Sequence, residues 1–162
     1  MASITNPGQG INVETNMITK SSGDFRWEGV DVKPYKEDGT LFKGVSRQTL
    51  FAGGVGMGVE FRYFEIEPGG HSTLERHEHE HAVIISRGSG AVFVSESVHP
   101  LELKDFIHVP PMTWHQFIAG PDEPLGFYCV VKIERDRPQR PSDEEFSSLV
   151  ALSPEVANFL KR

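Results

Sequence analysis

Between residues 46 and 133 the sequence is a succession of short segments with the composition of β-strands. Each segment is rich in Val, Ile, Phe and Tyr, and each is bounded by Gly, Pro, Asp or Ser, residues that favour turns. The segments span residues 48–52, 59–67, 82–86, 91–95, 106–109, 115–119 and 127–133. No apolar pattern with the 3.6-residue period of a helix lies between them. A chain of this kind is expected to be all-β, folded as an antiparallel sandwich or barrel.

The two ends of the chain differ in character from this central region. Residues 1–45 are mostly polar and are predicted to form an N-terminal arm with edge strands, while residues 46–135 form the barrel. Residues 136–162 contain two serines that can cap helices, Ser142 and Ser153, each followed by residues that favour a first helical turn. We therefore expect two short C-terminal helices that pack on the outside of the barrel as a helical tail.

Charge and composition exclude several classes of protein. The formal net charge of −7 argues against a nucleic-acid partner, because phosphate binding needs an excess of Lys and Arg. The chain has one cysteine, Cys129, so no internal disulfide can form. No segment approaches the roughly 18 apolar residues of a membrane span, and the first residues do not resemble a signal peptide. We expect a cytoplasmic protein that acts on a small-molecule substrate, without nucleic-acid or membrane partners.

Histidines are concentrated in the segment 75–81. From His77 onward an imidazole occupies every second position, so His77, His79 and His81 share one face if the segment is a strand. That face continues as apolar positions from Val83 onward. Imidazoles gathered on an interior face repel one another when protonated and need partners when neutral, and a divalent metal resolves both problems. The alternative is a solvated hairpin tip rich in His and Glu.

A second histidine supports the metal interpretation. Residues 109–117 contain a Pro-Pro turn that leads into a short strand, and the inward face of this strand carries His115 and Phe117. A histidine on a distant strand with an inward orientation is the arrangement that a metal site inside a barrel requires.

These residues resemble the first conserved motif of the cupin superfamily, G-x5-H-x-H-x3,4-E-x6-G. Gly69 and Gly88 match the glycines at its ends. Glu75, His77 and His81 fall at its three ligand positions, with carboxylate and imidazole exchanged relative to the usual order.

The second cupin motif, G-x5-P-x-G-x2-H-x3-N, is matched in part. Pro110 and His115 are in place, whereas Lys104 and Met112 stand where the motif has glycines, and Ala119 stands where it has Asn. The ligand position is therefore kept while the turn glycines are lost.

The resemblance covers roughly residues 58–135 and implies a cupin, or jelly-roll, β-barrel of antiparallel strands. The implied metal ligands are Glu75, His77, His81 and His115. In this set residues 78–80 form a three-residue hairpin loop with His79 at its tip, where it is a candidate catalytic residue. The alternative set uses His79 as a ligand.

The resemblance and the donor set together imply one divalent first-row transition metal per chain. Three imidazoles and a carboxylate, with no thiolate, suit Fe, Mn, Ni, Co or Zn and do not suit a closed structural zinc site. Four protein ligands on an octahedral ion leave two positions for substrate or dioxygen.

Two further residues are candidates for the site. Arg62 shares a strand face with Phe64, and if that face points inward Arg62 is a candidate catalytic residue that meets a substrate carboxylate; an outward surface arginine is the alternative. Cys129 lies on a late strand and is interpreted as a small buried hydrophobe, with a redox role as the alternative.

The resemblance favours an enzyme, although the cupin superfamily also includes non-enzymatic proteins. The first expectation is a metal-dependent dioxygenase or other oxidoreductase acting on a small organic molecule. The alternatives are an isomerase, a lyase or decarboxylase, and a barrel that binds a metal or small molecule without catalysis. A homodimer is also expected, because small cupins often pair through sheet edges and N-terminal arms.

Overall fold

The computed structural model describes residues 18–36, 41–54 and 56–162, which fall into two units that divide after Val30. In the first unit β1 (Ser21–Gly23) and β2 (Arg26–Trp27) form a short antiparallel hairpin. Asp24 and Phe25 have φ angles of 45° and 53°, and positive φ at both central residues is the pattern of the tight hairpin turns that match strand twist. The parts of the predicted arm at residues 1–17 and 37–40 lie outside the described residues.

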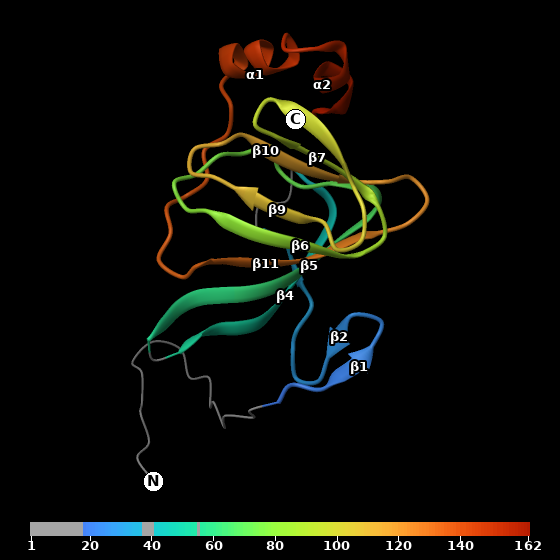
Figure 1. Ribbon diagram of the computed structural model, residues 1–162, viewed down its shortest axis with the longest axis vertical. Coiled ribbons are helices and arrows are strands. Elements are labelled where there is room, and N and C mark those ends of the chain that lie inside the picture. Colours follow the sequence, from blue (N-terminus) through green and yellow to red (C-terminus); the bar gives the residue numbers. More distant parts are fainter. Residues whose placement is uncertain (1–17, 37–40, 55) are drawn as a thin grey trace. The chain divides into compact units, whose positions relative to one another are not determined.

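The second unit is one antiparallel sheet of nine strands with two helices. The strands are β3 (Lys33–Pro34), β4 (Lys43–Gly54), β5 (Met57–His71), β6 (His81–Arg87), β7 (Gly90–Val94), β8 (Ser97–Leu101), β9 (Phe106–Val109), β10 (His115–Ala119) and β11 (Leu125–Lys132). Their order is β8-β7-β10-β5-β11-β6-β9, with β4 paired to β5 and β3 to β4. The sheet curls on itself into a half-barrel (Figure 1), so the predicted jelly-roll fold is confirmed.

Strand β8 is a barrel strand that the sequence pattern does not reveal. Its residues Ser97–Leu101 include His99 and Pro100, which are depleted from central strands. It lies at the end of the strand order, where a proline is tolerated because one edge of the strand needs no ladder partner.

The interior of the half-barrel is the hydrophobic core. Alternate residues of β5 and β6 face inward, and Ile66, Val83 and Ile85 are each at most 1% exposed. Phe127 on β11 stacks between Phe64 and Phe117, with ring centroids 5.5 and 4.8 Å apart. The predicted inward face that continues from the histidines is therefore confirmed, and one end of this core opens into the site described below.

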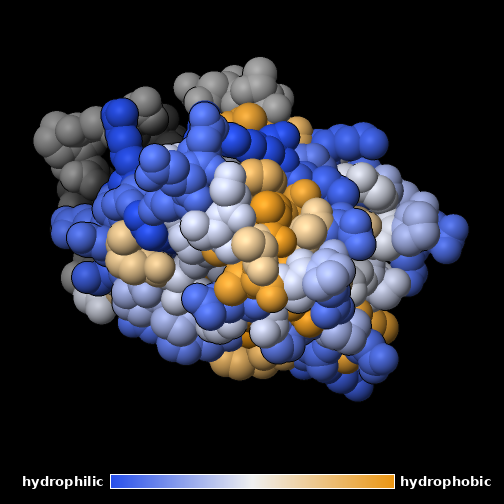
Figure 2. Space-filling view, turned by 90° about the horizontal axis from the view of Figure 1, so that it is seen from above, coloured by the Kyte–Doolittle hydropathy of each residue, from blue (hydrophilic) through white to orange (hydrophobic). Residues whose placement is uncertain are grey.

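Helices α1 (Asp143–Val150) and α2 (Pro154–Phe159) lie together at one end of the sheet (Figure 1). Leu149 and Val156 of the helices form a second apolar cluster with Phe93 of β7. From above, this end shows a band of apolar residues bordered by hydrophilic ones (Figure 2). The expected pair of short C-terminal helices is confirmed, whereas the division of the chain at residues 45 and 135 and the homodimer stay predictions.

The serine that caps α1 makes a reciprocal pair of hydrogen bonds. The Ser142 hydroxyl accepts from the Glu145 amide at 3.1 Å, and the Glu145 carboxylate accepts from the Ser142 amide at 2.9 Å. Ser142→Ala is expected to lower the free energy of unfolding by about 1 kcal/mol, because the Glu145 amide in the first turn loses its hydrogen-bond acceptor. Urea unfolding measures this, with Ser148→Ala as the matched control: its exposed hydroxyl bonds only a carbonyl in the same helix, and its effect is expected to stay within about 0.5 kcal/mol. Equal losses in the two variants would contradict the capping role.

The backbone keeps the turn geometry of the cupin motifs at the two positions where another residue replaces glycine. Gly88 has φ +64°, and a Cβ there would lie 1.8 Å from the carbonyl oxygen of Pro124, so only glycine fits. Lys104 and Met112, which replace the glycines of the second motif, have φ angles of 76° and 55°. The backbone therefore keeps the left-handed conformation at both positions, at a cost of about 1–2 kcal/mol each.

Neither helix in the described part of the chain has the length or the apolar run needed to cross a bilayer.

Candidate metal centre

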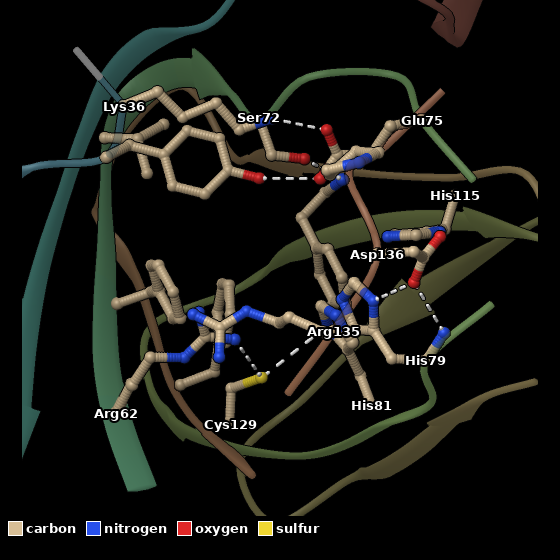
Figure 3. Close-up of a pocket in the computed structure, with 16 residues that line it drawn as sticks. Lys36, Arg62, Ser72, Glu75, His79, His81, His115, Cys129, Arg135 and Asp136 are labelled. Atoms are coloured by element: carbon tan, nitrogen blue, oxygen red, sulfur yellow. Dashed lines mark hydrogen bonds and ion pairs between the residues drawn. The ribbon is translucent and has the colours of Figure 1, made fainter. Parts of the chain in front are cut away.

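Three histidines, two from the segment 75–81 and one from a distant strand, converge inside the barrel. His81 opens β6, His115 opens β10, and His77 lies in the segment between β5 and β6. One ring nitrogen from each comes within 4.8 Å of the other two. Figure 3 shows the imidazoles of His81 and His115 pointing into the same cavity.

The segment 75–81 is not the continuous strand that the alternating histidines suggested. Only Glu75 and Arg76 form isolated bridges, and the chain bends at Glu78 and His79 before β6 begins. The strand interpretation is therefore wrong for this segment, and the loop over residues 78–80 implied by the motif is what the structure contains. Because of this bend, His77 and His81 face each other across a loop instead of following one another along a strand face.

Two of the clustered histidines have a backbone carbonyl that orients the ring. Nδ1 of His115 lies 2.9 Å from the carbonyl oxygen of Thr113, and Nδ1 of His77 lies 2.6 Å from that of His79. A carbonyl can only accept, so these Nδ1 atoms carry the protons and their Nε2 atoms are left with lone pairs. Nε2 of His77 and Nε2 of His81 are buried and have no hydrogen-bond partner among the described residues. An unpartnered ring nitrogen with a free lone pair, on a ring that a backbone carbonyl holds from the other side, as at His77, is the kind of donor that a divalent metal needs.

Burial also keeps these histidines neutral. Burial, together with repulsion from the neighbouring His115 and His79, lowers the pKa of His77 to about 4. Burial likewise lowers the pKa of His81, well below its usual value, and that of His115. At neutral pH the imidazoles are therefore available as ligands without first releasing a proton.

The depressed pKa of His77 predicts how the metal-free protein responds to acid. Between pH 6.5 and pH 4 the unfolded chain binds a proton at His77 that the folded chain does not, so the free energy of unfolding falls as pH falls through this window, by roughly 3 kcal/mol for this residue. Urea unfolding of chelator-treated protein at pH 7 and pH 4.5 measures the slope. His77→Gln is expected to flatten it, while His99→Gln, an exposed control, leaves it unchanged. Equal slopes in all three proteins would contradict the buried, neutral state of His77.

Glu75 lies beside the three histidines but is engaged elsewhere. Its backbone pairs with that of His115, and its buried carboxylate accepts from the Tyr35 hydroxyl at 3.2 Å and forms an ion pair with Lys36. It is not one of the three residues whose ligand atoms converge. Its membership of the ligand set stays a prediction.

His79, the alternative ligand, forms a dyad with an aspartate that the sequence analysis did not identify. Its Nδ1 lies 2.7 Å from Oδ1 of Asp136, and its ring stacks on that of His77 with centroids 3.6 Å apart. Burial alone raises the pKa of Asp136, but hydrogen bonds from the amides of Glu78 and His79 outweigh it and lower this pKa to about 2. Asp136 is thus a fixed negative charge that orients His79. It follows the last strand in a segment with no periodic pattern, so nothing in the sequence pointed to it.

Arg62 and Cys129 meet at the wall of the cavity beside His81. Arg62 is only 7% exposed and points inward, so the surface alternative for this residue is wrong. Its Nη2 lies 3.5 Å from Sγ of Cys129, and the same sulfur lies 3.6 Å from Nδ1 of His81 (Figure 3). Burial raises the pKa of the Cys129 thiol, and the Arg62 guanidinium acts in the other direction. The expectation that Cys129 is buried is confirmed, and the thiol also lines the cavity.

The cavity that holds these groups has a volume of about 140 Å³. Apolar walls from Phe64, Phe117 and Phe127 surround it, while Tyr35 and Lys36 add polar groups that the sequence analysis did not select. A largely apolar cavity with a few converging polar groups is the usual form of a small-molecule site.

Comparisons with known proteins agree with this architecture. The family model for the cupin domain matches residues 62–131. A protein of Rhodospirillum rubrum named 1-methylthio-D-xylulose 5-phosphate methylsulfurylase is 48% identical over 137 residues, which cover 84% of this chain and 86% of that protein.

Solved structures give the same result. A cupin 2 conserved barrel domain protein from Rhodopseudomonas palustris has a TM-score of 0.83 and 42% identity, over 90% of this chain and 99% of that one. A cupin-2 domain protein from Rhodospirillum rubrum has a TM-score of 0.78 and 43% identity, over 88% of this chain and 95% of that one.

Proposed function

This chain belongs to the cupin family, and on that premise we propose that it is a metal-dependent enzyme that transfers the methylsulfanyl group of a methylthio-substituted ketose phosphate to a thiol. The observation that carries the proposal is the position of the single thiol of the chain. Sγ of Cys129 lies 3.6 Å from Nδ1 of His81, one of the three converging histidines, so a candidate sulfur nucleophile and a candidate metal site share one cavity.

The name of the Rhodospirillum rubrum relative supplies the substrate class. In a 1-methylthio ketose the C1–S bond is adjacent to the C2 carbonyl, so electrons released from that bond can be delocalised onto the carbonyl oxygen. A divalent metal held by His77, His81 and His115 supplies, when bound, a Lewis acid for such an oxygen. We propose Fe, Mn, Ni, Co or Zn for this metal, at one ion per chain.

Cys129 acts in this proposal as the first acceptor of the methylsulfanyl group. Its thiolate attacks the sulfur of the substrate; the Sγ–S bond forms, the C1–S bond breaks, and the electron pair passes to C1 and the C2 carbonyl as an enolate. A proton delivered to C1 then completes the 1-deoxy ketose phosphate. A low-molecular-weight thiol is the required co-reactant: it attacks the methyl disulfide on Cys129, leaves as its own methyl disulfide and restores the thiolate.

Two other groups of the cavity support these steps. The Arg62 guanidinium, 3.5 Å from the sulfur, stabilises the thiolate relative to the buried thiol. His79, held by Asp136 at 2.7 Å, is placed at the cavity wall to deliver the proton. The relative's name favours this group transfer over the dioxygenase, isomerase and lyase chemistries that the sequence alone suggested, and we propose none of those.

The proposal is tested by incubating metal-loaded protein with 1-methylthio-D-xylulose 5-phosphate and a low-molecular-weight thiol. The expected products are the 1-deoxy ketose phosphate and the methyl disulfide of the added thiol, in equal amounts by proton NMR. Chelator-treated protein serves as the control and is expected to give neither. Unchanged substrate, or an oxidised product formed with uptake of dioxygen, would rule the proposal out.

A further inference from the structure

Three arginines from different strands meet beside the cavity. Arg62 lies on β5 and Arg135 follows β11, and both line the cavity. Arg47 lies on β4 opposite Phe64, while Thr49 lies opposite Arg62, so Arg47 and Arg62 share one face of the β4–β5 hairpin as diagonal neighbours. Burial lowers the pKa of Arg47, and repulsion from Arg62 lowers it further. The positive charges are therefore close enough to act on one another.

The carboxylate of Glu60 interacts electrostatically with all three guanidinium groups. Oε2 of Glu60 lies 2.8 Å from Nη2 of Arg135 and 3.9 Å from Nη1 of Arg62, and it also attracts the charge of Arg47. Among residues 18–36, 41–54 and 56–162, no other carboxylate forms an ion pair with any of these arginines. The group therefore carries two positive charges more than its acid neutralises, a surplus that a dianion would balance.

Two of the arginines also carry hydrogen-bond donors that no described residue accepts from. Nε of Arg62 and Nε of Arg47 are buried, and neither has a hydrogen-bond partner in the described chain. Arg62 is 7% exposed, so solvent does not replace the missing acceptors at its guanidinium. A buried donor left unpaired is costly, and a ligand that brings acceptor oxygens removes that cost.

Arg135 is held in place for such a ligand. Its Nη1 donates to the carbonyl oxygen of Lys132 at 2.8 Å, while Nη2 is directed to Glu60. A guanidinium that is already held by a nearby backbone carbonyl loses little side-chain entropy when it binds a ligand. Planar guanidinium groups also match the oxygens of a phosphate group particularly well.

We propose that Arg47, Arg62 and Arg135 form the subsite for the phosphate group of a phosphorylated substrate, with Glu60 as the counter-charge when the subsite is empty. This inference rests on the proposed function for its substrate class, a ketose phosphate. It places the phosphate at the wall of the cavity formed by β4, β5 and the segment after β11. Arg62 then has two roles: Nη2 contacts Cys129, and its other nitrogens face the phosphate.

The test measures the dissociation constant of inorganic phosphate by calorimetry on the full-length protein as purified. Arg135→Gln is expected to weaken phosphate binding about tenfold, because one charge-assisted donor is lost. Glu60→Gln is expected to strengthen phosphate binding severalfold, because a competing carboxylate is removed. A general loss of structure would weaken phosphate binding and so cannot explain an increase in affinity. Arg87→Gln is the matched control, since Arg87 also forms a 2.9 Å ion pair with a glutamate, Glu65, and has a similar exposure to Arg135. The affinity of the Arg87→Gln variant for phosphate is expected to be unchanged.

The outcome is separable from the fate of the proposed function. If 1-methylthio-D-xylulose 5-phosphate is converted but Arg135→Gln and Glu60→Gln bind phosphate as Arg87→Gln does, the subsite is wrong and the function stands. If phosphate affinity shifts in the two opposite directions but the compound is not converted, the function is wrong and the arginines remain an anion site. If both hold, Arg135→Gln also raises KM for the ketose phosphate about tenfold with a smaller change in kcat.

Discussion

Replacing His115 by alanine is expected to reduce the metal content of the purified protein from about one ion per chain to close to none. His115 is buried, and the carbonyl of Thr113 holds its Nδ1, so Nε2 is the ring nitrogen left to bind a metal. Even the loss of a group that only orients a ligand costs about 10–100-fold in metal affinity, and loss of a ligand itself is expected to cost more than about 100-fold. Elemental analysis after growth with added metal salts measures this directly.

The control for this result is His99→Ala, which removes an imidazole from the exposed surface and is expected to leave the metal content unchanged. Retention of a full metal load by His115→Ala would contradict the ligand set. The same measurement decides the fourth ligand: Glu75→Ala is expected to reduce affinity more than His79→Ala, and the opposite order would assign the position to His79.

Replacing Cys129 by serine is expected to reduce methylsulfanyl transfer by about a thousandfold or more, because the hydroxyl that replaces the thiol is a far weaker nucleophile toward sulfur. The substitution is nearly isosteric, and the new hydroxyl can still accept from Arg62 and contact His81. Metal content and the midpoint of urea unfolding are therefore expected to change little. The initial rate of 1-deoxy ketose phosphate formation, followed by NMR, gives the magnitude.

A parallel Cys129→Ala variant removes the polar atom altogether and is expected to be equally inactive. If either variant keeps a rate within tenfold of the natural protein while holding its metal, Cys129 is not the acceptor. Loss of metal along with activity would instead indicate that the thiol supports His81 structurally.

The strands of the barrel could be predicted because each alternates apolar and polar residues and ends at turn residues, and this pattern is set by local chemistry. Strand β8 could not, since Pro100 and His99 are tolerated there only because of its position at the edge of the sheet. The left-handed backbone conformation at Lys104 and Met112 could not be predicted from the sequence either. In both cases the surrounding sheet imposes a conformation that the local residues do not favour.

The histidines of the site could be chosen from sequence, but their arrangement could not. Alternation within residues 75–81 suggested a strand face, whereas the bend at Glu78 and His79 places His77 and His81 opposite each other. The Asp136 carboxylate that holds this bend comes from a segment 57 residues further along the chain than His79. Contacts of that range depend on the closed sheet and leave no periodic trace in the sequence.

The grouping of the three arginines could not be predicted from the sequence for the same reason. Arg62 was ambiguous because its strand has apolar residues on both faces, and only the pairing of β5 with β4 and β11 decides which face is inside. Its neighbours Arg47 and Arg135 join it through that pairing. A charge cluster built across strands is invisible to any pattern read along one of them.

The measurement that tests the account most directly is the mass of the intact, metal-loaded protein after a single turnover with 1-methylthio-D-xylulose 5-phosphate in the absence of added thiol. The predicted result is a gain of one methylsulfanyl group, located on Cys129 by peptide mapping and removed by a reducing thiol, with one equivalent of 1-deoxy ketose phosphate released. Release of that product with no change in protein mass, or no reaction by protein that holds its full metal load, would contradict the account.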